Sequence, residues 1–403
     1  MNSRVLLALC LGTVLLAAAN GSWAQGDQGQ KREPPRFFFE KGGGLAKPAD
    51  QPPPAKEAPP ATREGEPTAP AKPAFDFETA ESLAVWHPLD AEALVDLATE
   101  ENVAHAGKGC LRFTYSPREG VFEQLSARPL QVGDAQALAF WIMTDSPTNL
   151  SFGVVEKGGA FYQQFAYVPP EEWTPICVPL NSLLLSQDTT DASGKLEPTE
   201  ITEIRLADLT NLPGGLGDAL GRKTGVQQML LDDVAIGDQP APPVGTTSVA
   251  PLLADGFERT ALHALAIGGA VLRRTEGPAG HALEVLCQEA GSRWKGFVMA
   301  VGQLDLTDAK ELSLRLKASQ PLLLNVTLEE WDNSKYCQRI GIDPADGWTE
   351  KLLPLDRLLL DTTSTDENGA LDREQIRVLV IVADMTRADQ FPLTFGVDEV
   401  QFR

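Results

Sequence analysis

From about residue 75 to the C-terminus, apolar and polar side chains alternate along short stretches. In residues 111–115, 138–142 and 312–316 every second side chain is apolar. This period places the apolar side chains on one face of a β-strand. Gly, Pro, Asp and Asn separate the stretches, as is typical of turns. The pattern predicts an all-β chain of many short antiparallel strands that pack as sandwiches.

The strand pattern occurs twice, which indicates two copies of one domain. We expect the first copy at 74–238 and the second at 251–403, joined by a Pro-rich linker at 239–250. The first copy carries an extra loop around 211–225. The matched stretches are 137–143 with 311–317, 173–174 with 348–349, 179–180 with 354–355, 231–234 with 397–400, and 77–78 with 257–258.

The segment before the repeats has a different composition. Arg4 precedes an apolar run from Val5 to Ala19, and small residues lead to Ala24. This pattern predicts a signal peptide over residues 1–24, with a run too short to span a membrane. Residues 25–73 are rich in Pro, Ala, Lys and Glu, which predicts a disordered tether. Its Phe37–Phe39 segment either docks on a partner or is an apolar spot in the tether. We expect an exported protein, periplasmic or secreted.

Charge and cysteine content narrow the function classes. The formal net charge is −22, and the chain has only four histidines. Such a surface repels phosphate backbones, so nucleic-acid binding is not expected. Cysteines fall at non-equivalent positions in the two copies, which excludes a shared disulfide frame; buried free thiols or one private bridge per copy remain. These cysteines are Cys110, Cys177, Cys287 and Cys337.

The recurring motifs resemble those of carbohydrate-binding modules with a galactose-binding-like jelly roll, and of a related family named for complex I assembly intermediates. The motifs are Phe77-Glu78, Gly107-Lys108-Gly109, the Trp-Thr and Pro-Leu pairs at 173–174 and 179–180, and Asp232-Asp233-Val234. The second copy departs from the pattern with Gly280-His281-Ala282. The resemblance covers 75–238 and 255–403 and implies two tandem jelly-roll β-sandwiches. Since this frame occupies both copies, we expect no catalytic domain and no enzyme.

In modules of this kind, a Glu after the first strand and an Asp near the last strand often share a structural calcium ion. The resemblance therefore implies Glu78 with Asp232 in the first copy, and Glu258 with Asp398 in the second. Calcium prefers such hard oxygen ligands. The alternative is that these carboxylates are exposed charges at strand ends.

Strand parity suggests a polar groove in each copy. Leu138, Phe140 and Ile142 share the core parity, so Trp141 faces the other way, as Arg315 does in the second copy. Sugar binding needs aromatic faces and polar groups together. The alternative is a Trp141 covered by a loop. The predicted ligand-binding residues are Trp141, Gly153, Tyr162 and Gln164, with Arg315, Asn325, Glu329, Trp331, Tyr336 and Gln338 in the second copy.

Together these observations predict an exported, non-catalytic protein that binds extracellular or cell-wall polysaccharide through two modules. Basic residues on the second copy also make acidic or sulfated glycans candidates there. The alternative is a structural or assembly protein, in which the same sandwiches bind another protein.

Overall fold

The computed structural model describes residues 75–403 with short gaps. The gaps are 119–122, 187, 212–216, 218, 238–251, 258–260, 279, 290, 303 and 389. The predicted signal peptide, the tether with Phe37–Phe39, the linker and Glu258 therefore lie outside the described residues. All described residues belong to one compact unit. Within the described ranges, no helix reaches the length and apolarity that crossing a bilayer requires.

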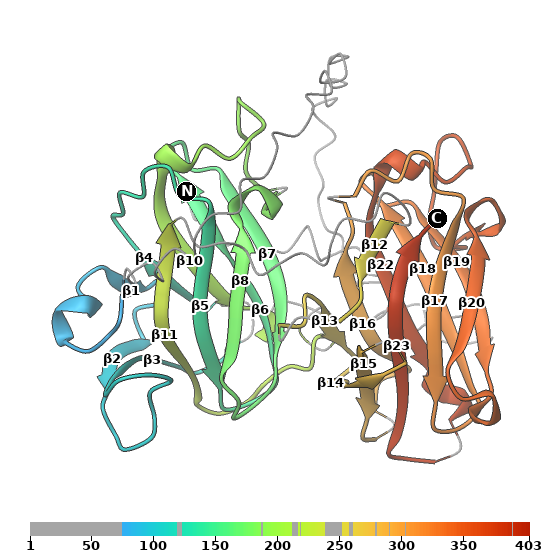
Figure 1. Ribbon diagram of the computed structural model, residues 1–403, viewed down its shortest axis with the longest axis horizontal. Coiled ribbons are helices and arrows are strands. Elements are labelled where there is room, and N and C mark those ends of the chain that lie inside the picture. Colours follow the sequence, from blue (N-terminus) through green and yellow to red (C-terminus); the bar gives the residue numbers. More distant parts are fainter. Residues whose placement is uncertain are drawn as a thin grey trace, which may run out of the picture. The chain divides into compact units, whose positions relative to one another are not determined.

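The first repeat folds into two facing antiparallel sheets (Figure 1). One sheet has six strands in the order β1-β4-β10-β6-β7-β9, and the other has five in the order β2-β3-β11-β5-β8. The strands are β1 (Trp86–Pro88), β2 (Leu94–Ala98), β3 (Cys110–Tyr115), β4 (Gln124–Ala127), β5 (Ala137–Thr144), β6 (Thr148–Glu156), β7 (Phe161–Val168), β8 (Thr174–Pro179), β9 (Leu184–Leu185), β10 (Ile201–Asp208) and β11 (Gln227–Gly237). Short 3-10 turns are η1 (Ala80–Leu83), η2 (Leu180–Ser182), η3 (Pro198–Glu200) and η4 (Leu209–Asn211).

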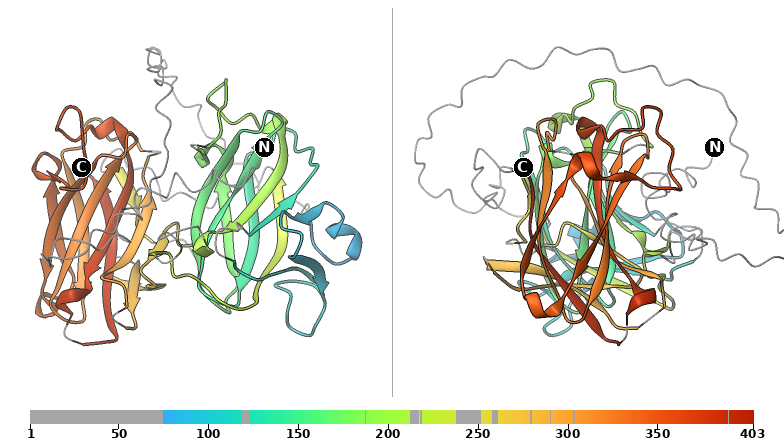
Figure 2. Two further views of the ribbon diagram at one scale, coloured as in Figure 1. Left: turned by 180° about the vertical axis from the view of Figure 1, so that it is seen from behind. Right: turned by 90° about the vertical axis from the view of Figure 1, so that its right-hand side faces the viewer.

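The second repeat has the same topology, seen from two more sides in Figure 2. Its sheets run β13-β16-β22-β18-β19-β21 and β14-β15-β23-β17-β20, with β12 added beside β23. The strands are β12 (Leu252–Asp255), β13 (Leu265–Ile267), β14 (Val271–Gly277), β15 (Gly280–Cys287), β16 (Trp294–Ala300), β17 (Glu311–Ala318), β18 (Leu322–Glu330), β19 (Lys335–Ile342), β20 (Thr349–Pro354), β21 (Leu359–Leu360), β22 (Ile376–Asp384) and β23 (Leu393–Phe402). The 3-10 turns are η5 (Pro344–Asp346), η6 (Leu355–Arg357), η7 (Arg373–Gln375) and η8 (Met385–Arg387). The predicted fold of two tandem β-sandwiches is confirmed.

Each sandwich has its own apolar core, built from the parity that the sequence shows. Leu138, Phe140 and Ile142 are buried in the first repeat, as are their counterparts on β17 in the second. Burial of such a side chain contributes about 1.5–3 kcal/mol. Cys110 and Cys287 are buried free thiols, and burial raises the pKa of Cys287 to about 11. The free-thiol alternative therefore holds at these two positions.

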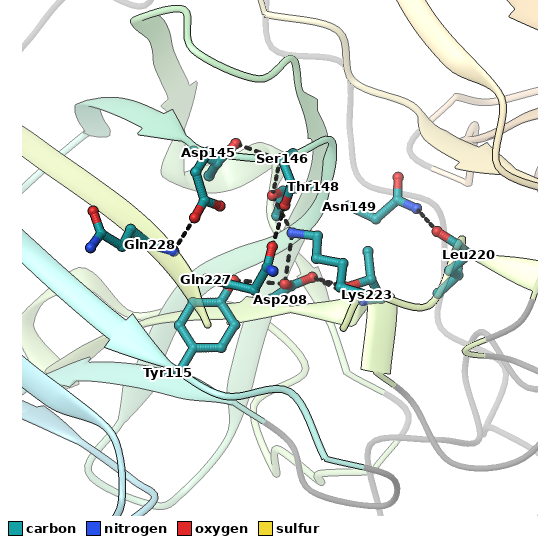
Figure 3. A network of polar contacts seen from close by, with 12 residues as sticks. Tyr115, Asp145, Ser146, Thr148, Asn149, Asp208, Leu220, Lys223, Gln227 and Gln228 are labelled. Atoms are coloured by element: carbon teal, nitrogen blue, oxygen red, sulfur yellow. Dashed lines mark hydrogen bonds and ion pairs between the residues drawn. The ribbon is translucent and has the colours of Figure 1, made fainter. Parts of the chain in front are cut away.

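The two repeats also contact each other. The amide N–H of Tyr167 on β7 donates to the carbonyl of Leu262, and Asn149 bonds both backbone groups of Ala266. The Asn149 side chain also donates to the carbonyl of Leu220 in the extra loop. That loop is held by Lys223, whose ammonium donates to Asp208 and Thr148 in a buried network (Figure 3). The sheet of the first repeat that contains β7 thus meets the sheet of the second repeat that contains β13, along these two strands.

Candidate ligand-binding site

The predicted groove residues fall on two different sheets. Trp141 lies on β5 in the five-stranded sheet, whereas Gly153 lies on β6 in the six-stranded sheet. Arg315 and Asn325 are separated in the same way in the second repeat. Trp141 and Gly153 therefore do not line one continuous face. Alternation assigns each strand an inner and an outer side, but it does not say which sheet a strand joins.

Trp141 faces outward, as its parity predicts, and a loop residue covers one of its ring faces. The His105 ring stacks on it with centroids 3.6 Å apart, and Trp173 meets His105 edge-on. His105 Nδ1 lies 3.3 Å from Asp233 Oδ2. In the second repeat Arg315 occupies the matched position and pairs with Glu399 at 2.6 Å. This placement agrees with the alternative given above, in which a loop covers Trp141.

The predicted tyrosines are buried and anchor loops. Tyr162 donates its hydroxyl to Asp191 at 2.5 Å, and Tyr336 donates to Asp366 at the matched place. Burial first, and then Asp191, raises the pKa of Tyr162. Gly153 is buried where strands approach closely, because an added Cβ would lie 2.0 Å from the carbonyl oxygen of Tyr162.

Two other predicted ligand-binding residues, Asn325 and Gln338, are partly buried. Asn325 donates its side-chain amide to the Thr327 hydroxyl at 3.0 Å. Gln338 is half-buried, and its Oε1 has no hydrogen-bond partner among the described residues. Neither residue lines the cavity described next.

A cavity of about 80 Å³ lies between the sheet that contains β7 in the first repeat and the sheet that contains β13 in the second. It brings together the predicted residues Gln164, from β7 of the first repeat, and Trp331, from the end of β18 in the second. Leu, Val and Ala side chains with Phe165 form most of its wall. The polar lining residues are Gln163, Gln164, Ser186, His263 and Arg377. A mostly apolar wall with a few convergent polar groups is typical of ligand sites.

Trp331 is the exposed aromatic of this cavity. It follows β18, its backbone N–H donates to Gln375, and 42% of the residue remains exposed. The Arg377 guanidinium lies 5.8 Å from its ring centroid, a distance that suits a cation–π contact. The indole is therefore fixed on one side while part of its surface stays accessible.

Arg377 enters the cavity wall from a buried ion cluster. Its Nη2 contacts Glu329 and donates to Asn333, and Lys335 lies 3.8 Å from the other oxygen of Glu329. Burial raises the pKa of Glu329, whereas the charges of Arg377 and Lys335 act in the opposite direction. The predicted ligand residue Glu329 is completely buried and contacts Arg377, so it does not itself face a ligand.

Two buried polar atoms of the lining have no hydrogen-bond partner within the described part of the chain. They are the Nε of Arg377 and the hydroxyl of Ser186, whose residues are 4% and 2% exposed. An unsatisfied buried donor costs about 1–3 kcal/mol unless a ligand or water pairs with it. Both atoms lie beneath the surface of the lining, so a ligand in the cavity would reach them only after a side-chain movement.

Sequence reasoning missed Ser186 and Arg377. Arg377 did leave a signal, because it is the one charge between Ile376 and Ala383 of an otherwise apolar strand. A charge in such a strand needs a buried partner. Ser186 gave no signal, since its place depends on how the repeats meet.

The predicted cation ligands of the first repeat converge on one loop. Glu78 Oε1 accepts the N–H of Lys108 at 2.9 Å, and Asp232 Oδ2 accepts those of His105 and Ala106. Gly107 is required here, because a Cβ would lie 1.8 Å from Glu78 Oε1. The carboxylates of Asp232 and Asp233 also lie within 4.8 Å of the His105 ring nitrogen.

Calcium prefers oxygen ligands, and the cluster that could hold a cation here consists of His105, Asp232 and Asp233, whereas Glu78 is exposed and is not part of it. Asp232 is also engaged by three backbone N–H groups, including that of Asp233 at 2.8 Å. A cation would therefore share this carboxylate with the loop. In the second repeat Asp398 Oδ1 accepts the N–H of Glu399 at 2.7 Å.

Unusual backbone conformations flank these carboxylates in both repeats. Phe77 and Phe257 have φ of 50° and 55°, and Asp233 and Glu399 have φ of 48° and 45°. A non-glycine residue in this region costs of the order of 1–3 kcal/mol and is concentrated at functional sites. The same two positions are strained in both copies, so the strain belongs to the shared frame.

Of the comparisons with known proteins, only the one with solved structures found matches. No family model and no curated protein matches the chain, so the resemblance to the complex I assembly family is unconfirmed. A family 11 carbohydrate-binding module of a Clostridium thermocellum cellulase is 18% identical, with 39% of this chain and 95% of that chain covered, at a TM-score of 0.31. A tandem of two CBM22 domains from Paenibacillus barcinonensis is 12% identical, covering 81% and 95%, at 0.28.

An exo-β-agarase is 18% identical to this chain. It covers 47% of this chain and 28% of that chain, at a TM-score of 0.34. These neighbours thus include carbohydrate-binding modules and an enzyme. At such TM-scores the likeness carries no argument about the ligand.

Proposed function

We propose that the protein binds carbohydrate, and that the cavity between the two repeats holds the sugar. The observation that carries this proposal is the exposed indole of Trp331 beside Gln164 and other polar side chains in the lining of one cavity. Sugar rings present C–H faces that pack on aromatic rings, and hydroxyls that need donors and acceptors.

The side chains divide the task by their chemistry. The exposed part of the Trp331 indole receives the C–H face of a pyranose ring. The polar side chains of the lining, Gln164 among them, supply donors and acceptors for the sugar hydroxyls. Gln164 is held by its hydrogen bond to the carbonyl of Ser182 at 2.7 Å. A preorganised side chain loses less entropy when the ligand binds.

The test is a binding screen of the full-length chain against neutral and acidic oligosaccharides and polysaccharides. For any glycan that binds, Trp331→Ala should weaken affinity about tenfold or more, which is about 1.4 kcal/mol. Trp331→Phe should retain most of the affinity because it keeps an aromatic face. The matched control is Leu352→Ala, which removes an exposed apolar side chain that does not line the cavity. Unchanged affinity in a folded Trp331→Ala protein would refute the cavity as the site.

The proposal includes a structural calcium ion in each repeat, held by Glu78 with Asp232 and by Glu258 with Asp398. The strained backbone beside these positions supports it. Calcium that binds only the folded state raises the melting temperature as its concentration rises. We expect Glu78→Gln combined with Asp232→Asn to reduce that shift. Equal melting temperatures in calcium and in chelator would reject the proposal.

Export completes the proposed function. Cleavage of the signal peptide after Ala24 would leave Gln25 as the first residue. N-terminal sequencing of protein recovered from outside the cytoplasm tests this, and an intact Met1 would contradict it.

A further inference from the structure

The outer side of the sheet that contains β13 is apolar where it meets the first repeat. Tandem modules move relative to each other by default, unless a large apolar interface holds them. We infer that this face is a permanent docking surface for the first repeat, and that the extra loop around 211–225 locks the two repeats together. The repeats then fold and unfold as one unit. This inference does not depend on the carbohydrate proposal.

The first argument is an apolar cluster that crosses between the repeats. The extra loop contributes Ala219 and Leu220, which are 5% and 3% exposed, and Leu209 precedes the loop. These side chains pack on a patch of the second repeat, whose buried members are Leu265, Ile267, Trp294, Val298, Val380 and Val382. All six lie outside the cluster that forms the core of the second repeat. Separation of the repeats would expose this patch to water, which soluble proteins rarely tolerate.

The second argument is a set of hydrogen bonds that fixes how the surfaces meet. The Asn149 side chain is buried, donates to the carbonyl of Ala266 and accepts the N–H of the same residue. Because the same amide reaches the carbonyl of Leu220, one side chain joins the first repeat, its loop and the second repeat. The N–H of Gly268 donates to the carbonyl of Ala219 at 2.5 Å. Apolar contact is non-directional, whereas these bonds specify one arrangement.

The turn after β13 has the shape that this contact needs. Gly268 and Gly269 both have φ of 70°, and a Cβ on Gly268 would lie 2.0 Å from the carbonyl oxygen of Trp294. A Cβ on Gly221 of the extra loop would lie 3.5 Å from the Cα of Gly269. The buried Lys295 donates to the carbonyl of Gly268 at 2.6 Å. Glycine therefore allows the turn and the loop to approach backbone to backbone.

The third argument is how the two repeats differ at matched strand positions. In the second repeat Val380 pairs with Thr327, and its side chain belongs to the shared cluster. In the first repeat Arg205 pairs with Gly153, the residue matched to Thr327. Arg205 bonds Glu203 at 2.8 Å on the same side of β10, so this face is polar. The frame thus accepts either character, and the apolar one occurs where the other repeat docks.

The converse difference occurs on β7 and β19. Phe165 of β7 packs against the shared cluster, whereas the matched Arg339 of β19 is exposed. The extra loop is likewise an insertion that the second repeat lacks in sequence. The contact is therefore heterologous, because it joins different faces of the two copies. The polar faces at the matched positions disfavour a further contact of the same kind with another chain.

Calorimetric unfolding of the full-length chain tests the coupling. We expect one transition whose calorimetric and van't Hoff enthalpies agree, because the repeats unfold together. Val380→Arg, which copies Arg205, should divide it into two transitions. The matched control Leu352→Arg places the same charge on an exposed side chain of the same repeat and should leave one transition. Two transitions in the wild type, a calorimetric enthalpy about twice the van't Hoff value, or one transition in Val380→Arg would overturn the inference.

Hydrogen exchange separates undocking from a general loss of stability. The N–H groups of Tyr167, Ala266 and Gly268 all donate across the interface, so they report docking directly. In the wild type they should exchange as slowly as the amides of the central strands β5 and β18. In Val380→Arg they should exchange about tenfold or more faster while β5 and β18 stay protected. Fast exchange of the three amides in the wild type, or equal acceleration at β18 in the variant, would contradict the docking assignment.

Discussion

The two repeats place a buried aspartate at the same point but neutralise it differently. Asp208 ends β10 and Asp384 ends β22, and each accepts the N–H and hydroxyl of the Thr two residues later. In the first repeat the counter-ion is Lys223 from the extra loop, which is 6% exposed. In the second repeat it is Arg293, which is 29% exposed. The contact between the aspartate and the threonine is local in sequence and is the same in both copies. The counter-ion comes from a different element in each copy.

The same contrast recurs beside the cavity. Glu329 in the second repeat is buried with Arg377 and Lys335, whereas the matched residue in the first repeat is the apolar Val155. A frame that tolerates either an ion cluster or a valine does not need the charges for folding. Of these three residues only Arg377 lines the cavity, and Glu329 holds its guanidinium from beneath.

The largest expected effect comes from breaking this cluster. Arg377→Met leaves Glu329 buried without its main partner and should cost about 3–5 kcal/mol of unfolding free energy. Adding Glu329→Val, which copies the first repeat, should recover at least half of that loss. Urea unfolding of the two variants measures both values. A double variant no more stable than Arg377→Met would show that the repeats are not equivalent here.

The buried aspartates give the next largest effect. Lys223→Met should cost about 3 kcal/mol because Asp208 and Lys223 are both buried. Arg293→Met should cost about 1 kcal/mol, since the arginine is partly exposed. Equal losses in urea unfolding would contradict the comparison.

Asp208 also predicts a pH dependence. Burial alone would raise the pKa of Asp208, but Lys223, Thr210 and Tyr115 together lower it. A lowered pKa stabilises the fold above the unfolded value of about 3.9, and this stability is lost as the pH falls through the folded pKa. Wild type should therefore lose stability below about pH 4 more steeply than Lys223→Met.

A smaller effect of opposite sign is expected at Glu330. Burial raises its pKa to about 7, from an ordinary value of 4.5. The folded state then binds this proton more tightly, so ionisation destabilises the fold in full above about pH 7, and the penalty disappears below about pH 4.5. Glu330→Gln should add about 1–2 kcal/mol at pH 8 and little at pH 4.5. Burial also raises the pKa of the matched Glu156, so Glu156→Gln should shift stability in the same direction.

The smallest effect concerns the outer faces. Trp141→Arg gives the first repeat the arrangement that Arg315 and Glu399 form in the second. A double-mutant cycle with Asp233→Asn should give a coupling of about 0.2–1 kcal/mol, because both groups are partly exposed. A coupling near zero would mean that the two loops differ too much for the ion pair to be transferred.

The sequence alone determined the strands, their buried sides and the duplication. Apolar side chains with a period of two reveal the inner side of each strand, as Leu138 and Leu312 show, and matched stretches reveal the repeat without any coordinates. These features depend on neighbours along the chain. The carboxylate and glycine positions of Glu78, Gly107 and Asp232 were also visible, because a motif fixes them locally.

The tertiary structure decided which side chains share a site. It placed Trp141 and Gly153 on different sheets, and it brought Gln164 of the first repeat to Trp331 of the second. It also left Ser186 and Arg377 with unpartnered atoms beneath the lining of one cavity. Strand pairing across a sandwich and the contact between repeats join residues that are far apart in the sequence. Local alternation carries no information on those distances, so the cavity depends on how the two copies pack.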